Sequence, residues 1–221
     1  MQLPLMQPPV KFSVKGQTFW LSPQHCVFWE EQSALILSDL HLGKTGHFRK
    51  HGIAVPQGVF MEDLQRLVDQ IAFFKPAKLI AVGDLFHSHA NKELDLFLKW
   101  RNDFASVDCI LIKGNHDILD EAWYERANIT VHSGQWQLGD IHFVHDPADI
   151  QGDVLYVFAG HLHPGISFSG MGKQTLRFPC FHFGSQHAVL PAFSRFSGLS
   201  GIRAKKNDSV FAIVDGKIIS V

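Results

Sequence analysis

The sequence of 221 residues has few cysteines, no long apolar run and almost no net charge. Its three cysteines, Cys26, Cys109 and Cys180, are odd in number and far apart, which excludes a disulfide framework and indicates reduced, buried thiols. No apolar stretch approaches the length of a membrane span. Residues 1–9 lack the cationic start and apolar run of a secretion signal. We therefore expect a cytoplasmic protein without a membrane partner.

The formal net charge of −1 excludes a basic surface over the whole molecule. Proteins that bind nucleic acid without regard to its sequence carry such a surface, so a nucleic-acid substrate would have to be bound locally. Local basic clusters do exist. One consists of Lys44, His47, Arg49, Lys50 and His51, and another of Arg203, Lys205 and Lys206. Each can equally be a solvated loop, and we interpret the second cluster in that way.

Two residue types are abundant, with 14 histidines and 19 phenylalanines. The hydrophobic fraction of 46% and the charged fraction of 19% are typical of a globular protein. We find no internal repeat and no linker rich in proline, glycine or serine. The length suits one substantial core, so we expect a single domain over residues 1–221.

The pattern of apolar residues predicts an α/β protein. Short apolar runs predict buried strands at residues 34–37, 78–82, 109–112, 141–144 and 156–159. Helical spacing predicts helices over residues 56–74 and 92–100. Residues 11–29 alternate around Lys15 and Gly16, which predicts a hairpin, and residues 173–221 suggest strands and turns. This order favours two sheets packed face to face with helices outside.

Five short segments rich in metal-ligating residue types each follow an apolar run. They are Asp39-Leu-His41, Gly83-Asp84-Leu-Phe-His87, Gly114-Asn115-His116-Asp117, His145-Asp146 and Gly160-His161-Leu-His163. Ligands bind at the carboxyl ends of strands in α/β sheets, because the loops of neighbouring strands converge there. Imidazole and carboxylate groups suit first-row divalent cations, and a pair of such cations suits phosphoester cleavage.

Each segment taken alone has an ordinary structural interpretation. Asp-X-His is common by chance, Gly-Asp after a strand is often a turn or a helix cap, and Gly-Asn-His-Asp can be a turn. Gly-His-X-His can be an exposed strand edge. These interpretations do not explain five such segments in one order, all at strand ends.

The ordered set resembles the calcineurin-like metallophosphoesterase superfamily over residues 34–163. This resemblance implies a four-layer α/β/β/α sandwich. It implies that Asp39, His41 and His163 bind a first metal ion. It implies that Asn115, His145 and His161 bind a second one. Asp84 resembles the carboxylate that bridges the two.

The chemistry explains these residue types. A bridging carboxylate can hold two cations roughly 3.5–4 Å apart, which matches an in-line displacement at phosphorus. Water held between them is acidic enough to serve as hydroxide near neutral pH. Manganese is the metal that we expect, with iron or zinc as alternatives, because nitrogen and oxygen ligands do not choose among them. By family resemblance His116 faces the phosphate, where it would protonate the leaving alkoxide or stabilise the phosphoryl oxygens.

His87 stands where many phosphatases of the superfamily have an aspartate. The Gly-Asp-Leu-Phe-His form is similar to that of the nuclease and phosphodiesterase branches, in which this histidine orients the catalytic one. A hydrogen bond from a neutral His87 would fix the tautomer of His116. The alternative is a histidine of an exposed loop.

A narrower resemblance is to the bacterial ligase-associated DNA damage response metallophosphoesterases, which are predicted endonucleases encoded beside a DNA ligase and a helicase. Its motifs are residues 38–44, Phe48-Arg49, residues 52–56, residues 190–193 and residues 196–201. The usual Thr-Gly-Gly-like ending appears here as Ser197-Gly198-Leu199. Within this resemblance Lys44 and Arg49 would contact substrate phosphate, although both can simply solvate a loop.

The function that we predict is a two-metal phosphodiesterase, a nuclease associated with DNA repair. A small-molecule phosphatase or cyclic-nucleotide phosphodiesterase is the alternative, and the near-neutral charge favours it, because nucleases gain affinity from basic surface. A repair scaffold with structural metals is a third hypothesis. Against it, His116 and His87 are not needed by a purely structural site. Related nucleases suggest a homodimer, and the sequence leaves the oligomeric state open.

Overall fold

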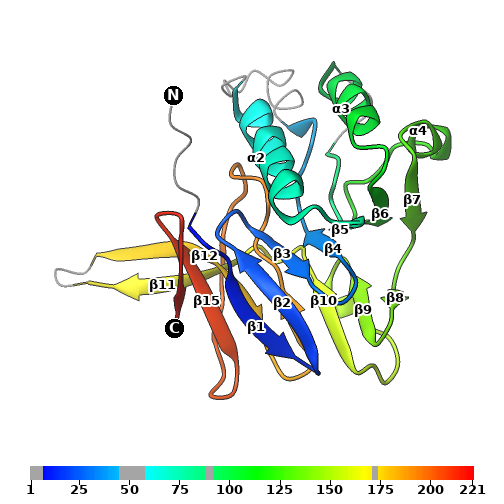
Figure 1. Cartoon of the computed structure of the whole chain (residues 1–221). Helices are drawn as coiled ribbons and strands as arrows, with labels where there is room; N and C mark the ends of the chain where they lie inside the picture. The colour runs from blue at the N-terminus through cyan, green and yellow to red at the C-terminus, as the bar shows by residue number, and fades with distance from the viewer. Residues whose placement is uncertain (1–6, 45–57, 88–91, 171–173) are drawn as a thin grey trace.

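The computed structural model describes residues 7–44, 58–87, 92–170 and 174–221, which form two sheets packed face to face (Figure 1). The first sheet has seven strands in the order of the sequence. They are β1 (Val10–Val14), β2 (Gln17–Ser22), β3 (Cys26–Trp29), β4 (Ala34–Leu37), β5 (Lys78–Val82), β6 (Asp108–Ile112) and β7 (Ile129–His132). Strands β1 to β4 are antiparallel, and β4 to β7 are parallel.

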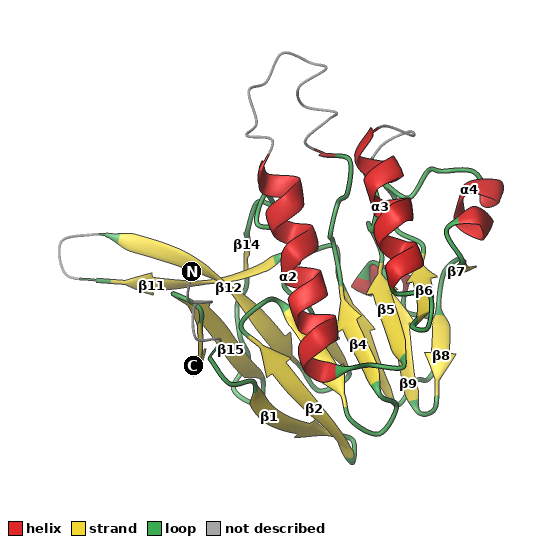
Figure 2. Cartoon of the chain, turned by 45° about the horizontal axis from the view of Figure 1, so that its top comes forward, coloured by secondary structure: helices red, strands yellow, loops and turns green. Residues whose placement is uncertain are grey.

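In the part of the chain that the structure describes, three helices connect the parallel strands and cover one face of this sheet (Figure 2). They are α2 (Gly58–Phe74), α3 (Lys92–Asp103) and α4 (Glu121–Arg126). The two longer helices were predicted from their apolar spacing, and α2 indeed packs Phe60, Leu64 and Leu67 against the sheet. The described part of α2 begins at Gly58, and Pro56 lies outside the described residues.

The second sheet follows the order β14-β11-β12-β13-β10-β9-β8, and β15 and β16 extend it from β12. Its strands are β8 (Trp136–Leu138), β9 (Ile141–Val144), β10 (Tyr156–Ala159), β11 (Pro164–Ser169), β12 (Thr175–Phe183), β13 (His187–Val189), β14 (Ser200–Gly201), β15 (Ser209–Val214) and β16 (Lys217–Ser220). Strand β10 is parallel to both of its neighbours, β9 and β13.

Alternation along β4 shows why the chain forms this sandwich. Leu35 and Leu37 pack against the helices, whereas Ala34 and Ile36 pack against the second sheet. Successive side chains of a strand point to opposite faces, so a strand buried on both faces must be apolar throughout, as β4 is. The core between the sheets is rich in aromatic rings, among them Phe143 and Phe158.

The predicted fold class is therefore confirmed: it is an α/β sandwich of two mixed sheets with helices. Over the second sheet, the described residues contribute only the 3-10 turn η1 (Pro147–Asp149), near a small apolar cluster of Val144, Val157 and Ala159. Among the described residues, no helix is both long and apolar enough to span a bilayer.

Candidate metal centre

The five predicted segments meet at one edge of the sandwich. Asp39 and Asp84 follow the parallel strands β4 and β5, and Asn115 follows β6. His145 and His161 follow β9 and β10, which are parallel in the second sheet. Parallel strands end at the same edge, so residues far apart in the sequence come together there.

Six of the predicted ligands form two compact groups. Asp39, His41 and His163 form the first group, and Asp84, His145 and His161 form the second. Within each group one nitrogen or oxygen atom per residue lies within 4.8 Å of the others. Each group combines side chains from both sheets. These two groups are candidate sites for divalent metal ions.

The second group has the spacing of ligands around one cation. His145 Nε2 lies 3.1 Å from His161 Nδ1, 3.0 Å from Asn115 Oδ1 and 3.5 Å from Asp84 Oδ1. Ligands about 2.0–2.2 Å from a common metal ion lie about 3 Å apart when their bonds meet at right angles. Asn115, although exposed, lies beside this group, and its predicted role as a ligand stays a prediction.

Asp84 lies between the two groups. Its Oδ1 faces His145 of the second group at 3.5 Å, and its Oδ2 faces His41 of the first group at 4.0 Å. The carboxylate is buried, and its Oδ1 also accepts a hydrogen bond of 2.9 Å from the backbone N–H of His116. This arrangement suits the bridging position that the sequence predicted for Asp84.

Buried polar atoms of the first group fit a cation. Asp39 Oδ1 and both ring nitrogens of His41 are buried without a hydrogen-bond partner among the described residues. His163 Nε2 lies 3.3 Å from Asp39 Oδ1 but outside hydrogen-bonding geometry. An unpaired buried polar group is destabilising by about 1–3 kcal/mol, so these atoms call for a ligand of another kind. A divalent cation is such a ligand.

His41 is held in the neutral form that binds metals. Burial lowers the pKa of His41 to about 2, and the nearby charge of Lys44 and the neighbouring histidines act in the same direction. A neutral imidazole keeps a lone pair for a metal ion. The same donor set of imidazole and carboxylate groups suits manganese, iron and zinc.

The backbone of the ligand segments is strained. Asp39, His41, Asp84, His161 and His163 all have positive φ, between 45° and 64°. Such conformations are destabilising by about 1–3 kcal/mol each and gather at functional sites. Here a backbone–side-chain bond fixes two of these segments together, because His161 N–H donates to Asp39 Oδ2 at 3.0 Å.

Gly83 precedes Asp84 for two physical reasons. Its φ of +77° is unfavourable for other residues, and a Cβ atom at this position would overlap the ring of His145. A Cβ atom on Gly114 would likewise overlap the Asp84 carboxylate. Both glycines therefore allow one ligand loop to approach another closely.

His116 and His87 lie beside the first group. Their rings are 4.2 Å apart between centroids with an interplanar angle of 36°, and the His41 ring lies 5.7 Å from His116 and 5.3 Å from His87. The two rings thus lie in close, tilted contact. The contact agrees with a role of His87 in orienting His116, and the predicted hydrogen bond between them stays a prediction.

Two further aspartates, Asp117 and Asp146, organise the loops, and neither has a role that was predicted from the sequence. Buried Asp117 accepts hydrogen bonds from the backbone N–H groups of Phe86, at 2.8 Å, and Gly114, at 2.9 Å, so it joins the loops after β5 and β6. Burial raises the pKa of Asp117 to about 7, against the effect of these two donors. Asp146 Oδ2 lies 3.5 Å from His161 Nε2 and orients that ring. The sequence feature that could have identified these two residues is their position next to predicted metal ligands.

Of the two predicted substrate-binding residues, the structure describes Lys44 alone. Lys44 is partly buried near the first group, where burial lowers its pKa and the carboxylates of Asp39 and Asp84 raise it. Arg49 lies outside the described residues, as do Phe48 and the rest of the first basic cluster. Arg203, Lys205 and Lys206 are exposed, as expected of a solvated loop.

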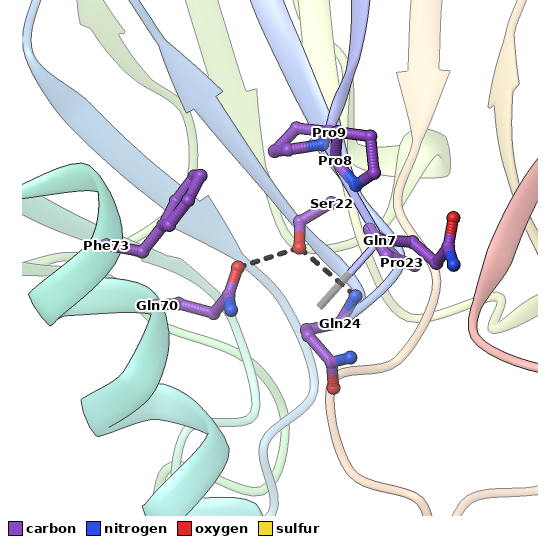
Figure 3. Close-up of a pocket in the computed structure, with 8 residues that line it drawn as sticks. All are labelled: Gln7, Pro8, Pro9, Ser22, Pro23, Gln24, Gln70 and Phe73. Carbon is purple, nitrogen blue, oxygen red and sulfur yellow. Dashed lines mark hydrogen bonds between the residues drawn. The ribbon is translucent and has the colours of Figure 1, made fainter. Parts of the chain in front are cut away.

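A separate pocket opens between the N-terminal segment and α2 (Figure 3). It is lined by Gln7, Pro8, Pro9, Ser22, Pro23, Gln24, Gln70 and Phe73. Ser22 donates a hydrogen bond of 2.7 Å to Gln70 Oε1 across it (Figure 3). None of these side chains is a carboxylate or an imidazole, so the pocket offers no hydrolytic chemistry.

Two adjoining groups of side chains that could each hold a divalent cation lie at the strand ends of this sandwich, an arrangement that suits metal-dependent hydrolysis of phosphoesters. A sequence profile of the calcineurin-like phosphoesterases matches residues 33–195, and the chain belongs to that family. None of the curated proteins compared with the chain matches it significantly.

Among solved structures, the chain is similar to the Pseudomonas putida nuclease MPE. The two share 27% identity with a TM-score of 0.82, over 96% of this chain and 100% of that one. YfcE, a phosphoesterase from E. coli, shares 14% identity with a TM-score of 0.46 over 85% of this chain and 97% of that one. Vps29 from Entamoeba histolytica, complexed with zinc, shares 14% identity with a TM-score of 0.38, over 85% of this chain and 96% of that one.

Proposed function

We propose that the protein is a two-metal phosphodiesterase that acts on nucleic acid, a nuclease of DNA repair. The observation that carries this proposal is the position of Asp84 between two candidate ligand groups, with the contacting rings of His87 and His116 beside them. The likeness to a nuclease over 96% of the chain supports the choice of a diester of nucleic acid.

The ligands that we propose are those of the two groups, completed by one amide. Asp39, His41 and His163 would hold one cation; Asn115, His145 and His161 would hold the other. Asp84 would contact both. When bound, the two cations would supply an activated water and neutralise charge on the phosphoryl oxygens. We propose manganese as the metal, with iron and zinc compatible with the same ligands.

The residue with a chemical role of its own is His116. In its protonated form it would donate a proton to the departing alkoxide as the P–O bond breaks, which is worth about 10²–10⁴-fold in rate. Its ring touches those of His87 and His41 and is not part of either ligand group, so it is available for this transfer. His87 would act as a positioning residue through the contact between the two rings.

One alternative function has an observation in its favour. The net charge of −1 is low for a nuclease, and a small-molecule phosphatase or cyclic-nucleotide phosphodiesterase would not need basic surface. A scaffold with structural metals is disfavoured by His116, because a structural site would not place a third imidazole beside its ligands.

The association with repair rests on the resemblance of residues 38–44, 48–49, 52–56, 190–193 and 196–201 to ligase-associated enzymes. A DNA ligase and a helicase are the partners that this resemblance suggests, and the cytoplasm is the compartment. Association with these enzymes and the homodimer remain proposals about the assembly.

The test is cleavage of circular and linear DNA, each single- and double-stranded, with manganese and with a chelator. We expect manganese-dependent cutting of circular single-stranded DNA, which has no end and therefore requires an endonuclease. The variant Asp84→Ala, which lacks the bridging carboxylate, is the control and should be inactive. If the protein hydrolyses cyclic nucleotides or nitrophenyl phosphate but no oligonucleotide, the small-molecule alternative replaces the nuclease.

A further inference from the structure

A cationic hollow lies beside the first ligand group. It has a volume of about 400 Å³ and is lined by Lys44, Arg195, Phe196, Ser197 and Gly198. Of these, Arg195 is exposed, and Phe196 is 40% exposed. The volume lies within the range of small-ligand sites, about 300–1,000 Å³.

Backbone pairing fixes this hollow next to the metal ligands. Ser38 forms a parallel bridge with Ala192, and the N–H of Phe193 donates to Ser38 O at 2.8 Å. The N–H of Ser194 then donates to the carbonyl oxygen of the ligand Asp39 at 3.2 Å. Because the two segments run parallel, Arg195 and Phe196 emerge at the same edge as Asp39 and the residues that follow it.

A second, smaller hollow adjoins the first, because Lys44 and Phe196 line both. His41 of the first ligand group and Ser194 also line it, as do the acidic residues Asp63 and Glu93. Lys44 and Phe196 therefore lie near both the first ligand group and Arg195.

Buried side chains anchor the segment that precedes Arg195. The buried guanidinium of Arg66 donates to Phe193 O at 2.5 Å and lies 4.5 Å from the centroid of the Phe193 ring. His25 donates through Nδ1 to Ala192 O at 2.7 Å. Arg66 is paired with Asp63 at 3.5 Å, so its charge is compensated inside the protein. Arg195 instead presents its charge at the surface.

We propose that this hollow is the binding site for the part of a single-stranded polynucleotide that flanks the scissile bond. Arg195 and Lys44 bind the neighbouring phosphate, and Phe196 stacks on a neighbouring base. The inference rests on the proposed nuclease function and names its substrate form. It also resolves how a chain with a net charge of −1 can bind a polyanion, because the contact is local.

The residue types fit this occupant. A guanidinium matches the geometry of phosphate oxygens and forms paired, charge-assisted hydrogen bonds with them. An exposed aromatic ring stacks on bases of any identity, but only where the base has left a duplex. The combination of phosphate contact and aromatic platform is therefore typical of single-strand binding.

The experiment compares Arg195→Ala, Arg195→Lys and Phe196→Ala with two matched controls, Arg203→Ala and Phe168→Ala. Arg203 is an exposed cation, and Phe168, at 38% exposure, matches Phe196. Each variant is measured for cleavage of a single-stranded hexanucleotide and of bis-nitrophenyl phosphate with manganese. Binding of a fluorescent single-stranded oligonucleotide is measured in chelator at several salt concentrations, so that it does not depend on activity.

We expect Arg195→Ala to lower kcat/KM on the hexanucleotide about 10–100-fold, mainly through KM, as loss of a charge-assisted bond predicts. The fold-decrease of kcat/KM that Arg195→Ala causes on bis-nitrophenyl phosphate should be at least ten times smaller. The slope of log binding constant against log salt should fall by about 0.7, one phosphate contact. Arg195→Lys should recover part of the affinity. Phe196→Ala should weaken binding about 5–100-fold without changing the salt slope.

Three results would overturn the inference. Behaviour of Arg195→Ala and Phe196→Ala like that of the controls would assign both residues to the solvated surface. Equal losses on both substrates would assign them to folding or chemistry. Tighter binding of duplex than of single strands would exclude base stacking. A wild type that cleaves the small diester but no oligonucleotide would instead refute the proposed function itself.

Discussion

At the scale of single residues, His116 is the group whose role can be separated from metal binding. Its ring contacts that of His87 and lies outside both ligand groups, so its removal should leave the ligands in place. Two roles are then open to it. As a proton donor it matters most for a basic leaving group, whereas stabilisation of the phosphoryl oxygens matters for every substrate.

We predict that His116→Ala loses about 10²–10⁴-fold in kcat on a dinucleotide, whose alkoxide needs a proton, and only a few-fold on bis-nitrophenyl phosphate. Metal content, measured by elemental analysis, should be unchanged. His87→Ala should show the same pattern more weakly. Similar losses on both leaving groups would contradict the donor role and favour electrostatic stabilisation.

Candidate metal ligands could be proposed from the sequence because metal binding restricts residue types so strongly. Asp39, Asp84 and His145 are recognisable at strand ends without any contact information. The role of Asp117 was not predictable, because an aspartate that bonds the backbone N–H of Phe86 looks the same as one in a surface turn. Arg195 was missed for a related reason: only the pairing of Ser194 with Asp39 brings it to the site.

At the scale of elements, the buried strands were predicted closely and the short helix α4 was not. Strands β4 and β5 are continuous apolar runs, and the structure has them at the predicted residues. Helix α4 has only six residues, too few for apolar residues to repeat visibly at helical spacing. Its start is fixed by the N-cap Asp120, whose side chain accepts a hydrogen bond from Trp123 N–H. Local capping is harder to recognise in a sequence than burial.

The turn after β5 allows a controlled test of close packing. Gly83 and Gly134 have nearly equal φ, +77° and +74°, but a Cβ atom on Gly134 has nothing within 4 Å. We predict that Gly134→Ala is destabilising by about 1–2 kcal/mol through backbone strain alone. Gly83→Ala should add displacement of His145 and loss of the second cation, with at least a hundredfold loss of activity.

Calorimetric unfolding and elemental analysis of the two glycine variants measure these effects. Full metal content and activity in Gly83→Ala would contradict the close approach of Gly83 to His145. An equal loss of metal in Gly134→Ala would mean that backbone strain alone, without the overlap, disturbs the centre.

At the scale of the whole molecule, each candidate cation would tie the two sheets together. Asp39 and His41 follow β4 of the first sheet, whereas His163 follows β10 of the second; likewise Asp84 follows β5, and His145 and His161 follow β9 and β10. A ligand that binds only the folded state stabilises it, by about 2.7 kcal/mol at a concentration a hundred times its dissociation constant.

We therefore predict that manganese raises the Tm by about 5–10 °C over the chelated protein, since about 1 kcal/mol shifts the Tm of a chain of this size by about 2–4 °C. Asp84→Asn should lose most of this increase while it keeps the Tm of the chelated form. Differential scanning calorimetry measures both. A Tm that does not respond to manganese would mean that the sheets hold together without the cations.

This division of ligands between the sheets has a consequence for the life of the protein in a cell. Chains without cations would open more often between the sheets, where buried rings such as Phe143 and Phe158 would be exposed. Proteases and chaperones act on such opened states, and a change of 1–2 kcal/mol can alter abundance several-fold. The supply of metal would then set how much of the protein accumulates, in addition to how fast each molecule works.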